Sequence, residues 1–249
     1  MANITLIGYG KMGQVIEKVA LARGHKIVSI IDPNVPKAFK EINAESLKNT
    51  DVCIDFTHPS VIVSNITKVA ALGKNIVIGT TGWYEHMAQV ESIVNGNNIG
   101  SIWSGNFSIG VNAFFRIVET ASSIFNYVKD YDVSVNEIHH SQKADSPSGT
   151  AAMIGNIILK NMKSKTKIVT DRLNRKIEPN ELNISSTRVG NVPGIHTVMF
   201  DSLADTIELK HTARTRDGFA LGAVLAAEFI IGKKGFYSIE DLMNNLIQD

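Results

Sequence analysis

The chain has 249 residues, of which 44% are hydrophobic and 20% are charged, and Lys plus Arg total 25 against 24 Asp plus Glu. This length suits two modest domains, and this composition excludes a largely disordered chain. The formal net charge of +1 gives no broad attraction for nucleic acid or for an anionic membrane. We therefore expect no nucleic-acid partner and no membrane partner.

The apolar runs of the chain are short. The longest, residues 219–231, contains Glu228 and is too short to span a bilayer, and residues 4–7 are too few for the core of a signal peptide. The single cysteine, Cys53, lies in the apolar run 52–54 and has no second thiol to pair with. These observations predict a soluble, cytoplasmic protein without a targeting peptide.

The first hundred residues alternate short β-branched runs with longer helical patterns, which is typical of a parallel sheet covered by helices. The predicted strands are residues 4–7, 27–31, 52–56, 76–78 and 99–103, and the predicted helices are residues 11–23, 59–72 and 83–94. The fold class predicted from this alternation is α/β, with an N-terminal Rossmann-type dinucleotide-binding domain over residues 1–110.

Beyond residue 110 the alternation stops, and a helix at 112–126 leads into a strand-rich region. The predicted strands are residues 133–138, 183–189, 196–202 and 205–213, with one helix at 150–162 between them. This pattern predicts a C-terminal α+β domain with a mixed sheet over residues 111–217. Because few helices cover that sheet, we expect self-association through it. A helix at 219–231 opens the segment 218–249, which we expect to pack back onto the first domain.

A glycine-rich loop follows the first predicted strand and precedes the first predicted helix. It reads Gly8, Tyr9, Gly10, Lys11, Met12, Gly13 and matches G-x-G-x-x-G in the strand and helix context that gives the pattern meaning. The first glycine permits the tight turn, Gly10 lets a pyrophosphate approach the backbone, and Gly13 allows close packing of helix on strand. The loop predicts a bound dinucleotide.

Asp32 ends the second predicted strand, 19 residues after Gly13. A carboxylate there accepts hydrogen bonds from the adenosine ribose and repels a 2′-phosphate, which favours NADH. Lys11 and Lys37 offset part of this repulsion. The residues alone therefore leave NADH and NADPH both open.

The most informative stretch runs from Glu137 to Ala151. His139 and His140 follow a strand, Lys143 adds a cation, and Ser148-Gly149-Thr150 opens a helix whose free N–H groups can hold a carboxylate or phosphate. An imidazole exchanges its proton near neutral pH, so a histidine here suits a general acid. Taken singly, each residue also fits a strand end, a loop charge or a helix cap. Taken together, they predict a site for an anionic substrate.

The pattern E-x-H-H-x-x-K-x-D-x-P-S-G-T-A in this stretch resembles the dihydrodipicolinate reductases, also called 4-hydroxy-tetrahydrodipicolinate reductases. The similarity extends over nearly the whole chain, and Ser146 and the compact glycine loop are small departures from the family pattern. Further segments of the chain resemble the family: residues 55–57, 79–82, 106–110 and 188–190, Gly194, His196, residues 211–213, Arg216 and residues 219–220.

The resemblance implies a role for each matching position. His139 would be the proton donor and Lys143 a second acid that neutralises substrate charge, whereas His140, Gly149 and Thr150 would bind the substrate carboxylates. The nicotinamide end of the cofactor would contact Gly79, Thr80, Thr81, Ser104, Gly105, Asn106 and Phe107. The family also implies a homotetramer formed through its mixed sheets.

The implied reaction reduces a cyclic dicarboxylate in lysine and diaminopimelate synthesis. Hydroxylated tetrahydrodipicolinate loses water, a ring carbon takes a hydride from NADH or NADPH, and His139 or Lys143 protonates the neighbouring carbon to give tetrahydrodipicolinate. The residues do not decide which of the two donates the proton. Two carboxylates on a rigid ring explain why cationic groups and a helix start converge.

Two other classes share the glycine loop. Another two-domain dehydrogenase would differ in the second domain, and a semialdehyde dehydrogenase needs a nucleophilic cysteine, for which Cys53 is badly placed. A non-enzymatic dinucleotide sensor would not need His139 and Lys143 beside an anion-binding helix start. His196 and His211 lack neighbours in sequence at ligand spacing, so we expect no metal.

Overall fold

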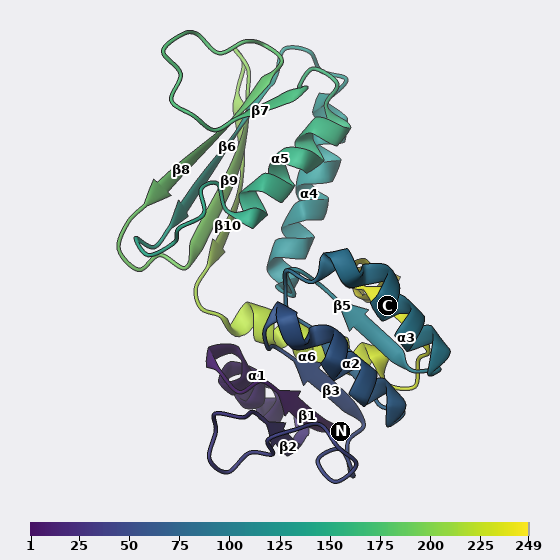
Figure 1. Ribbon diagram of the computed structural model, residues 1–249. Helices are drawn as coiled ribbons and strands as arrows, with labels where there is room; N and C mark the ends of the chain where they lie inside the picture. The colour runs from purple at the N-terminus through teal and green to yellow at the C-terminus, as the bar shows by residue number, and fades with distance from the viewer. Residues whose placement is uncertain (249) are drawn as a thin grey trace. The chain divides into compact units, whose positions relative to one another are not determined.

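The computed structural model describes residues 1–248, which form two compact units (Figure 1). Unit 1 comprises residues 1–109 together with the chain from Arg216 onward, and unit 2 comprises Gly110–Thr215. The chain therefore leaves unit 1 once and returns to it.

Unit 1 is built on a sheet of six parallel strands. Their order across the sheet is β11-β5-β4-β3-β1-β2. Their bounds are β1 Asn3–Ile7, β2 Lys26–Ile31, β3 Val52–Asp55, β4 Asn75–Ile78, β5 Gly100–Trp103 and β11 Gly235–Ser238. Strand order reverses at β1, since β2 lies on one side of it and β3 on the other. The loop after β1 therefore lies at the switch point where open α/β sheets bind ligands.

Helices pack against this sheet. Helix α6 (Asp217–Ile230) packs against α1 (Lys11–Ala22) and contacts β3, β4 and β5, and α2 (Ile62–Ala71) packs against α3 (Met87–Gly96). The short helices η1 (Pro59–Val61) and η2 (Tyr84–His86) lead into α2 and α3, and α7 (Ile239–Gln248) follows β11. Every residue of β3 and β4 is buried, which explains why these strands read as unbroken apolar runs.

Unit 2 is a five-stranded mixed sheet with two helices. The strand order is β10-β9-β6-β8-β7, antiparallel on the β9 side of β6 and parallel on the β8 side. The bounds are α4 Ile109–Phe125, β6 Asp132–His139, α5 Gly149–Asn161, β7 Lys167–Val169, β8 Glu181–Arg188, β9 Gly194–Asp201 and β10 Thr206–Ala213. Alternate residues of β6 and β9 are buried, because one face of the sheet packs against the core that α4 and α5 complete.

The predicted fold class is confirmed: unit 1 has the parallel sheet and unit 2 the mixed sheet. The prediction missed β7, β11 and α7, which have three, four and ten residues. The two strands are too short for an alternating pattern to be recognised. The predicted single helices at 59–72 and 83–94 each begin as a separate short helix, η1 and η2. Among residues 1–248, no helix has the length and apolar character needed to cross a membrane.

Candidate active site

The glycine loop between β1 and α1 has three glycines in three different environments. A Cβ on Gly8, whose φ is +87°, would lie 2.4 Å from the Phe56 carbonyl oxygen, and a Cβ on Gly13 would lie 2.4 Å from the Gly8 carbonyl oxygen. A Cβ on Gly10 would meet nothing within 4 Å. Gly8 and Gly13 therefore allow close packing, while Gly10 presents bare backbone to open space, as a pyrophosphate requires.

The start of α1 and the end of β2 adjoin the glycine loop. Gly10 precedes α1 and supplies no side-chain cap, so the first N–H groups of the helix remain available to an anion beside the exposed Lys11. The Asp32 carboxylate accepts the Tyr9 N–H and the Asn34 N–H, both at 2.8 Å. These bonds fix Asp32 next to the loop, where a ribose would lie. The residues present fit a dinucleotide.

The predicted nicotinamide-side residues lie after β4 and β5. The Thr80 hydroxyl is buried and donates to the Asp55 carboxylate at 2.8 Å, so its side chain is structural. Burial raises the pKa of Asp55, while hydrogen bonds from Thr57, Asn65 and Thr80 oppose that shift. Gly79 lies under the Phe56 ring, since a Cβ there would come within 2.1 Å of it. Thr81 is exposed.

The segment from Ser104 to Phe107 forms a tight turn after β5. The Ser104 hydroxyl donates to the Asn106 carbonyl at 2.8 Å and accepts the Asn106 N–H at 3.0 Å. Gly105 approaches the Tyr84 hydroxyl, and Phe107 is buried with its carbonyl against Gly222 of α6. Phe107 therefore has a packing role in the fold.

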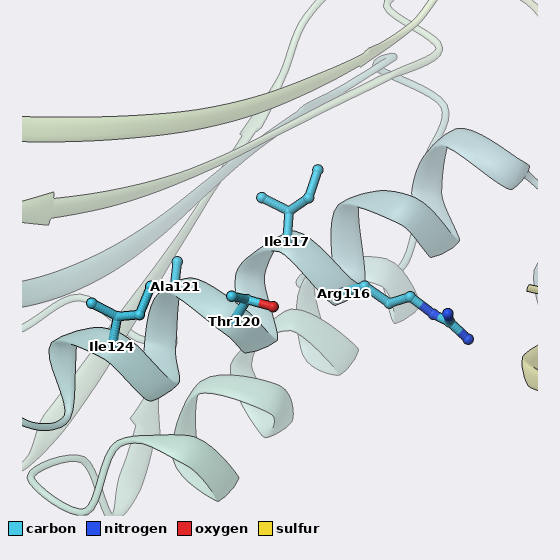
Figure 2. Close-up of a pocket in the computed structure, with 5 residues that line it drawn as sticks. All are labelled: Arg116, Ile117, Thr120, Ala121 and Ile124. Atoms are coloured by element: carbon cyan, nitrogen blue, oxygen red, sulfur yellow. The ribbon is translucent and has the colours of Figure 1, made fainter. Parts of the chain in front are cut away.

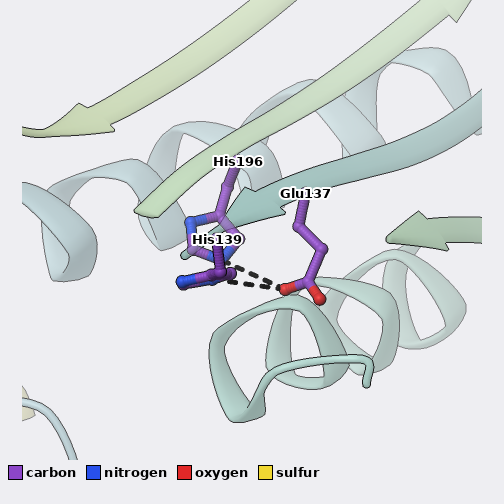
Figure 3. Close-up of side chains that lie close together, drawn as sticks. All are labelled: Glu137, His139 and His196. Atoms are coloured by element: carbon purple, nitrogen blue, oxygen red, sulfur yellow. Dashed lines mark hydrogen bonds and ion pairs between the residues drawn. The ribbon is translucent and has the colours of Figure 1, made fainter. Parts of the chain in front are cut away.

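In unit 2, strand alternation and strand pairing bring three ionisable side chains together. Glu137 and His139 are two residues apart on β6, so both face the core, and Glu137 pairs with His196 on antiparallel β9. Figure 3 shows the three side chains converging below the ends of these strands. All three are buried. The core face of unit 2 therefore ends in a polar cluster.

The distances within this cluster are short. His139 Nε2 lies 3.4 Å from Glu137 Oε2 and 3.4 Å from His196 Nε2, and His196 Nε2 lies 3.6 Å from Glu137 Oε2. The other nitrogen of His139, Nδ1, lies 3.1 Å from the Pro193 carbonyl oxygen. A carbonyl only accepts, so His139 Nδ1 carries a proton and donates it.

Lys143 lies on the loop after β6. Its Nζ donates to both oxygens of Asp145, at 2.7 and 2.9 Å, and this hydrogen bond lowers the pKa of Asp145. Arg188 at the end of β8 holds the same loop: it donates to the Asp145 carbonyl at 2.6 Å and to Glu137 Oε1 at 2.9 Å. Arg188 therefore connects the loop that carries Lys143 to Glu137 through hydrogen bonds.

Helix α5 begins beside that cluster. Ser148 is its N-cap: the hydroxyl accepts the Ala151 N–H at 3.2 Å, and the Ser148 N–H donates to both oxygens of Glu137 at 3.1 Å. A Cβ on Gly149 would meet nothing within 4 Å, and Thr150 is half-buried in the first turn. His140 is half-buried just beyond the end of β6. The helix start thus presents open backbone beside the Glu137 cluster.

Burial and charge set the protonation of the cluster. Burial raises the pKa of Glu137, but hydrogen bonds from Ser148, Arg188 and Ser186 outweigh it, so the net shift is downward and Glu137 is anionic. Burial lowers the pKa of His139, while the Glu137 charge opposes this. Burial, followed by the proximity of His139, lowers the pKa of His196 to about 4. His196 is therefore neutral at neutral pH.

The sequence argument against a metal site was wrong in its premise. Within residues 1–248, ligand-type atoms of Glu137, His139 and His196 lie within 4.8 Å of one another. The acid was missed because it adjoins His196 through strand pairing and not through the sequence. Glu137 already accepts bonds from Arg188, Ser186 and the Ser148 N–H, so its charge is balanced by a fixed cation. The absence of a metal stays a prediction that this charge balance favours.

A separate hollow lies on the outer surface of α4. Figure 2 shows its side chains, which all project from that one helix: Arg116, Ile117, Thr120, Ala121 and Ile124. None of the predicted site residues lines it. The predicted site residues lie instead on the loops after β1, β4 and β5 and around the Glu137 cluster.

The predicted set of site residues leaves out several residues that organise unit 2. These are Glu137, Asp145, Ser148, Arg188 and His196. The sequence did contain evidence for two of them. Glu137 precedes His139 by two residues in a predicted strand, so both face the same side, and Ser148 stands at the cap position of a predicted helix. The contacts of Arg188 and His196 depend on strand register, which the sequence does not reveal.

Comparison with known proteins covers almost the whole chain. The family model described as "Dihydrodipicolinate reductase, N-terminus" matches residues 2–107, and that described as "Dihydrodipicolinate reductase, C-terminus" matches residues 110–243. The chain is 39% identical, over 247 residues, to the 4-hydroxy-tetrahydrodipicolinate reductase of Christiangramia forsetii, covering 99% of this chain and 100% of that one.

Two further relatives agree with this match. The chain is 35% identical to the 4-hydroxy-tetrahydrodipicolinate reductase of Staphylococcus aureus, covering 96% of this chain and 100% of the relative. The solved structure of dipicolinate-bound dihydrodipicolinate reductase from Paenisporosarcina sp. TG-14 superposes with a TM-score of 0.78 at 25% identity, covering 96% of this chain and 97% of that one. The chain belongs to the dihydrodipicolinate reductase family.

Proposed function

We propose that this protein is a 4-hydroxy-tetrahydrodipicolinate reductase that uses NADH or NADPH in lysine and diaminopimelate synthesis. The observation that carries the proposal is the group of anion-binding and proton-exchanging residues in unit 2: His139, His140 and Lys143 beside the open start of α5. Full-length relatives that bear this name support it, as does the solved relative whose title records bound dipicolinate, a ring with two carboxylates.

Unit 1 is proposed to bind the dinucleotide. The backbone at Gly10 and the free N–H groups of α1 suit a pyrophosphate, and Asp32 suits a ribose. When bound, the cofactor supplies the hydride. Residues 79–81 and 104–107 are proposed to contact its nicotinamide end, with Thr80 contributing backbone because its hydroxyl is committed to Asp55.

Unit 2 is proposed to bind the dicarboxylate and to move the proton. Gly149 and Thr150 offer backbone N–H groups and a hydroxyl at a helix start, and His140 and Lys143 add polar contacts to the second carboxylate. The ring loses water, then gains the hydride at one carbon and a proton at the adjacent carbon. Lys143 or His139 releases that proton and regains one from solvent, which balances the step.

The assembly and location are proposed on separate grounds. The face of the unit 2 sheet that points away from the core carries apolar side chains that are at least partly exposed, among them Ile138, Ile195 and Met199, which supports a homotetramer formed through this sheet. Light scattering on the purified chain should give four times the 27.1 kDa of one copy. The single buried thiol of Cys53 supports a reducing, cytoplasmic location.

The function is tested by coupled turnover. Substrate is generated in situ from aspartate semialdehyde and pyruvate by its synthase, and oxidation of NADH and of NADPH is followed separately. We expect rapid oxidation with the wild type and at least a hundredfold lower kcat for Lys143→Ala. Lys129→Ala, which removes an exposed lysine between α4 and β6, is the matched control and should keep full activity. No oxidation by folded wild-type protein would contradict the proposal.

A further inference from the structure

The buried carboxylate of Glu137 contacts polar groups from several parts of unit 2. Its Oε1 accepts from Ser186 at 2.8 Å and from Arg188 at 2.9 Å, both oxygens accept the Ser148 N–H, and its Oε2 lies 3.4 Å from His139 Nε2. The carboxylate is fully buried. A buried charge with this many partners is costly to disturb, so its contacts fix the atoms around it.

The contacts of His139 define its tautomer. Nδ1 donates to the Pro193 carbonyl, so the neutral ring carries no proton on Nε2. Nε2 lies 3.4 Å from His196 Nε2, which itself lies 3.2 Å from the Ser148 hydroxyl oxygen.

The backbone of β9 also holds the His139 ring. A Cβ on Gly194 would lie 2.9 Å from His139 Cε1, so glycine is what allows the strand to pass over the ring. The ring is therefore fixed by Pro193 and Gly194 on one side and by Glu137 and His196 on the other. A second proton on Nε2 would lie beside the Glu137 carboxylate.

Glu137 also reaches the two other parts of the proposed substrate site. Through the Ser148 N–H it fixes the residue that caps α5, next to Gly149 and Thr150. Through Arg188, which also donates to the Asp145 carbonyl, it fixes the loop that carries Lys143. One carboxylate thus connects the imidazole, the helix start and the lysine loop.

We propose that Glu137 is the positioning residue of this site, a buried carboxylate whose contacts hold His139, the start of α5 and the Lys143 loop in one arrangement. The proposal rests on the proposed function for its catalytic consequence. Glu137 contacts neither substrate nor cofactor in this scheme, and it acts through His139, Ser148 and Arg188. The charged and titratable groups that face His139 are Glu137 on β6, His196 on β9, Arg188 on β8 and Lys143 on the loop.

The direction of the effect follows from charge. The Glu137 anion raises the pKa of His139 against the opposing effects of burial, Lys143 and Arg188. Replacing Glu137 by Gln removes that anion while keeping the side-chain size. The pKa of His139 should therefore fall further, and the alkaline limb of the kcat profile, on which a proton-donating His139 loses its proton, should move to lower pH.

The experiment combines kinetics with ¹⁵N-histidine NMR on the full chain. We expect Glu137→Gln to lower kcat at least tenfold with a smaller change in KM and to lower the pKa of His139. Glu181→Gln is the matched control, because Glu181 is also buried and pairs with Arg175 at the other end of the sheet. That variant should leave kcat within about twofold, and the pKa of His139 within about 0.2 units, of the wild type.

Each outcome decides one claim. An unchanged His139 pKa in Glu137→Gln would overturn the positioning role, whatever the turnover. Spectra that change when wild-type protein is dialysed against EDTA would show a metal in the cluster and overturn it as well. If the NMR results are as expected but the wild-type protein does not turn over the dicarboxylate, the proposed function is contradicted and the positioning role of Glu137 is not.

Discussion

At the residue scale, the site consists of charges that the fold has already paired. Asp145 accepts two bonds from Lys143, Glu137 is paired with Arg188, and Asp32 accepts two backbone N–H groups. Paired charges have fixed positions, so a ligand meets side chains that are already oriented and loses less entropy on binding. A substrate carboxylate that binds Lys143 must compete with Asp145 for it.

Asp32 carries the prediction about cofactor preference. Asp32→Asn removes the charge that would repel a 2′-phosphate, so the ratio of kcat/KM for NADPH to that for NADH should rise about fivefold to tenfold, or ~1–1.4 kcal/mol. Separate initial-rate assays with the two cofactors measure this ratio. Asp51→Asn makes the same change at the other end of β1, where Asp51 accepts the Asn3 N–H, and should leave the ratio unchanged. A ratio that does not rise in Asp32→Asn would show that the carboxylate does not face the adenosine ribose.

At the element scale, close approaches of backbone to backbone position the loops of unit 1. Gly13 of α1 lies against the Gly8 carbonyl, and Gly222 of α6 lies against the Phe107 carbonyl. Side chains at these places would push the helices away from the sheet. Helix α6 is also joined to the end of α1 by Glu228, which accepts two bonds from Arg23 and pairs with His25.

Gly222 gives the prediction at this scale. A Cβ at Gly222 would lie 1.6 Å from the Phe107 carbonyl oxygen, so Gly222→Ala must displace α6 or the turn that ends at Phe107. We expect the free energy of unfolding to fall by about 3 kcal/mol or more, as for other forced overpacking in a core. Urea unfolding measures it.

Gly96→Ala is the control for that prediction. Gly96 is the last residue of α3, and a Cβ there would meet nothing within 4 Å. This variant should be as stable as the wild type or more stable by up to about 1 kcal/mol, because alanine favours a helix over glycine. Equal stability of Gly222→Ala and Gly96→Ala would mean that α6 does not approach Phe107 so closely.

At the scale of the whole molecule, buried titratable groups link stability to pH. The pKa of His196 is lowered from 6.5 to about 4 in the folded chain. Between these values the unfolded chain binds a proton that the folded chain does not, so the free energy of unfolding falls as pH falls through this window. The stabilisation is fully present above pH 6.5. Glu137 acts in the same direction at lower pH, since the stability that its lowered pKa contributes is present above its ordinary value of 4.5 and is lost as pH falls below that value.

The corresponding experiment compares urea unfolding at pH 7 and pH 4.5, at one protein concentration, for the wild type and His196→Gln. We expect the wild type to lose up to about 3 kcal/mol more than the variant over this interval. Equal losses would show that His196 is not buried in its neutral form.

The sequence by itself determined the repeating features of this protein. Apolar spacing in α1 and α2 follows from the helical period, and the buried runs of β3 and β4 follow from a sheet covered on both faces. The glycine loop and the run from Glu137 to Thr150 could also be recognised as motifs in the sequence. Their residues are neighbours in the chain, and their chemistry depends on the local backbone. The family resemblance rested on these same contiguous motifs, and the comparisons confirm it.

The tertiary structure alone decided which distant residues meet. Glu137 lies beside His196 because β6 and β9 are antiparallel in one register, and Arg188 reaches the Lys143 loop because β8 runs parallel to β6. A shift of one residue in either pairing would turn these side chains to the other face of the sheet. Register is fixed by packing of the whole core and not by local sequence. For that physical reason the sequence could propose His139 as a site residue, whereas it could not reveal the side chains that surround the His139 ring.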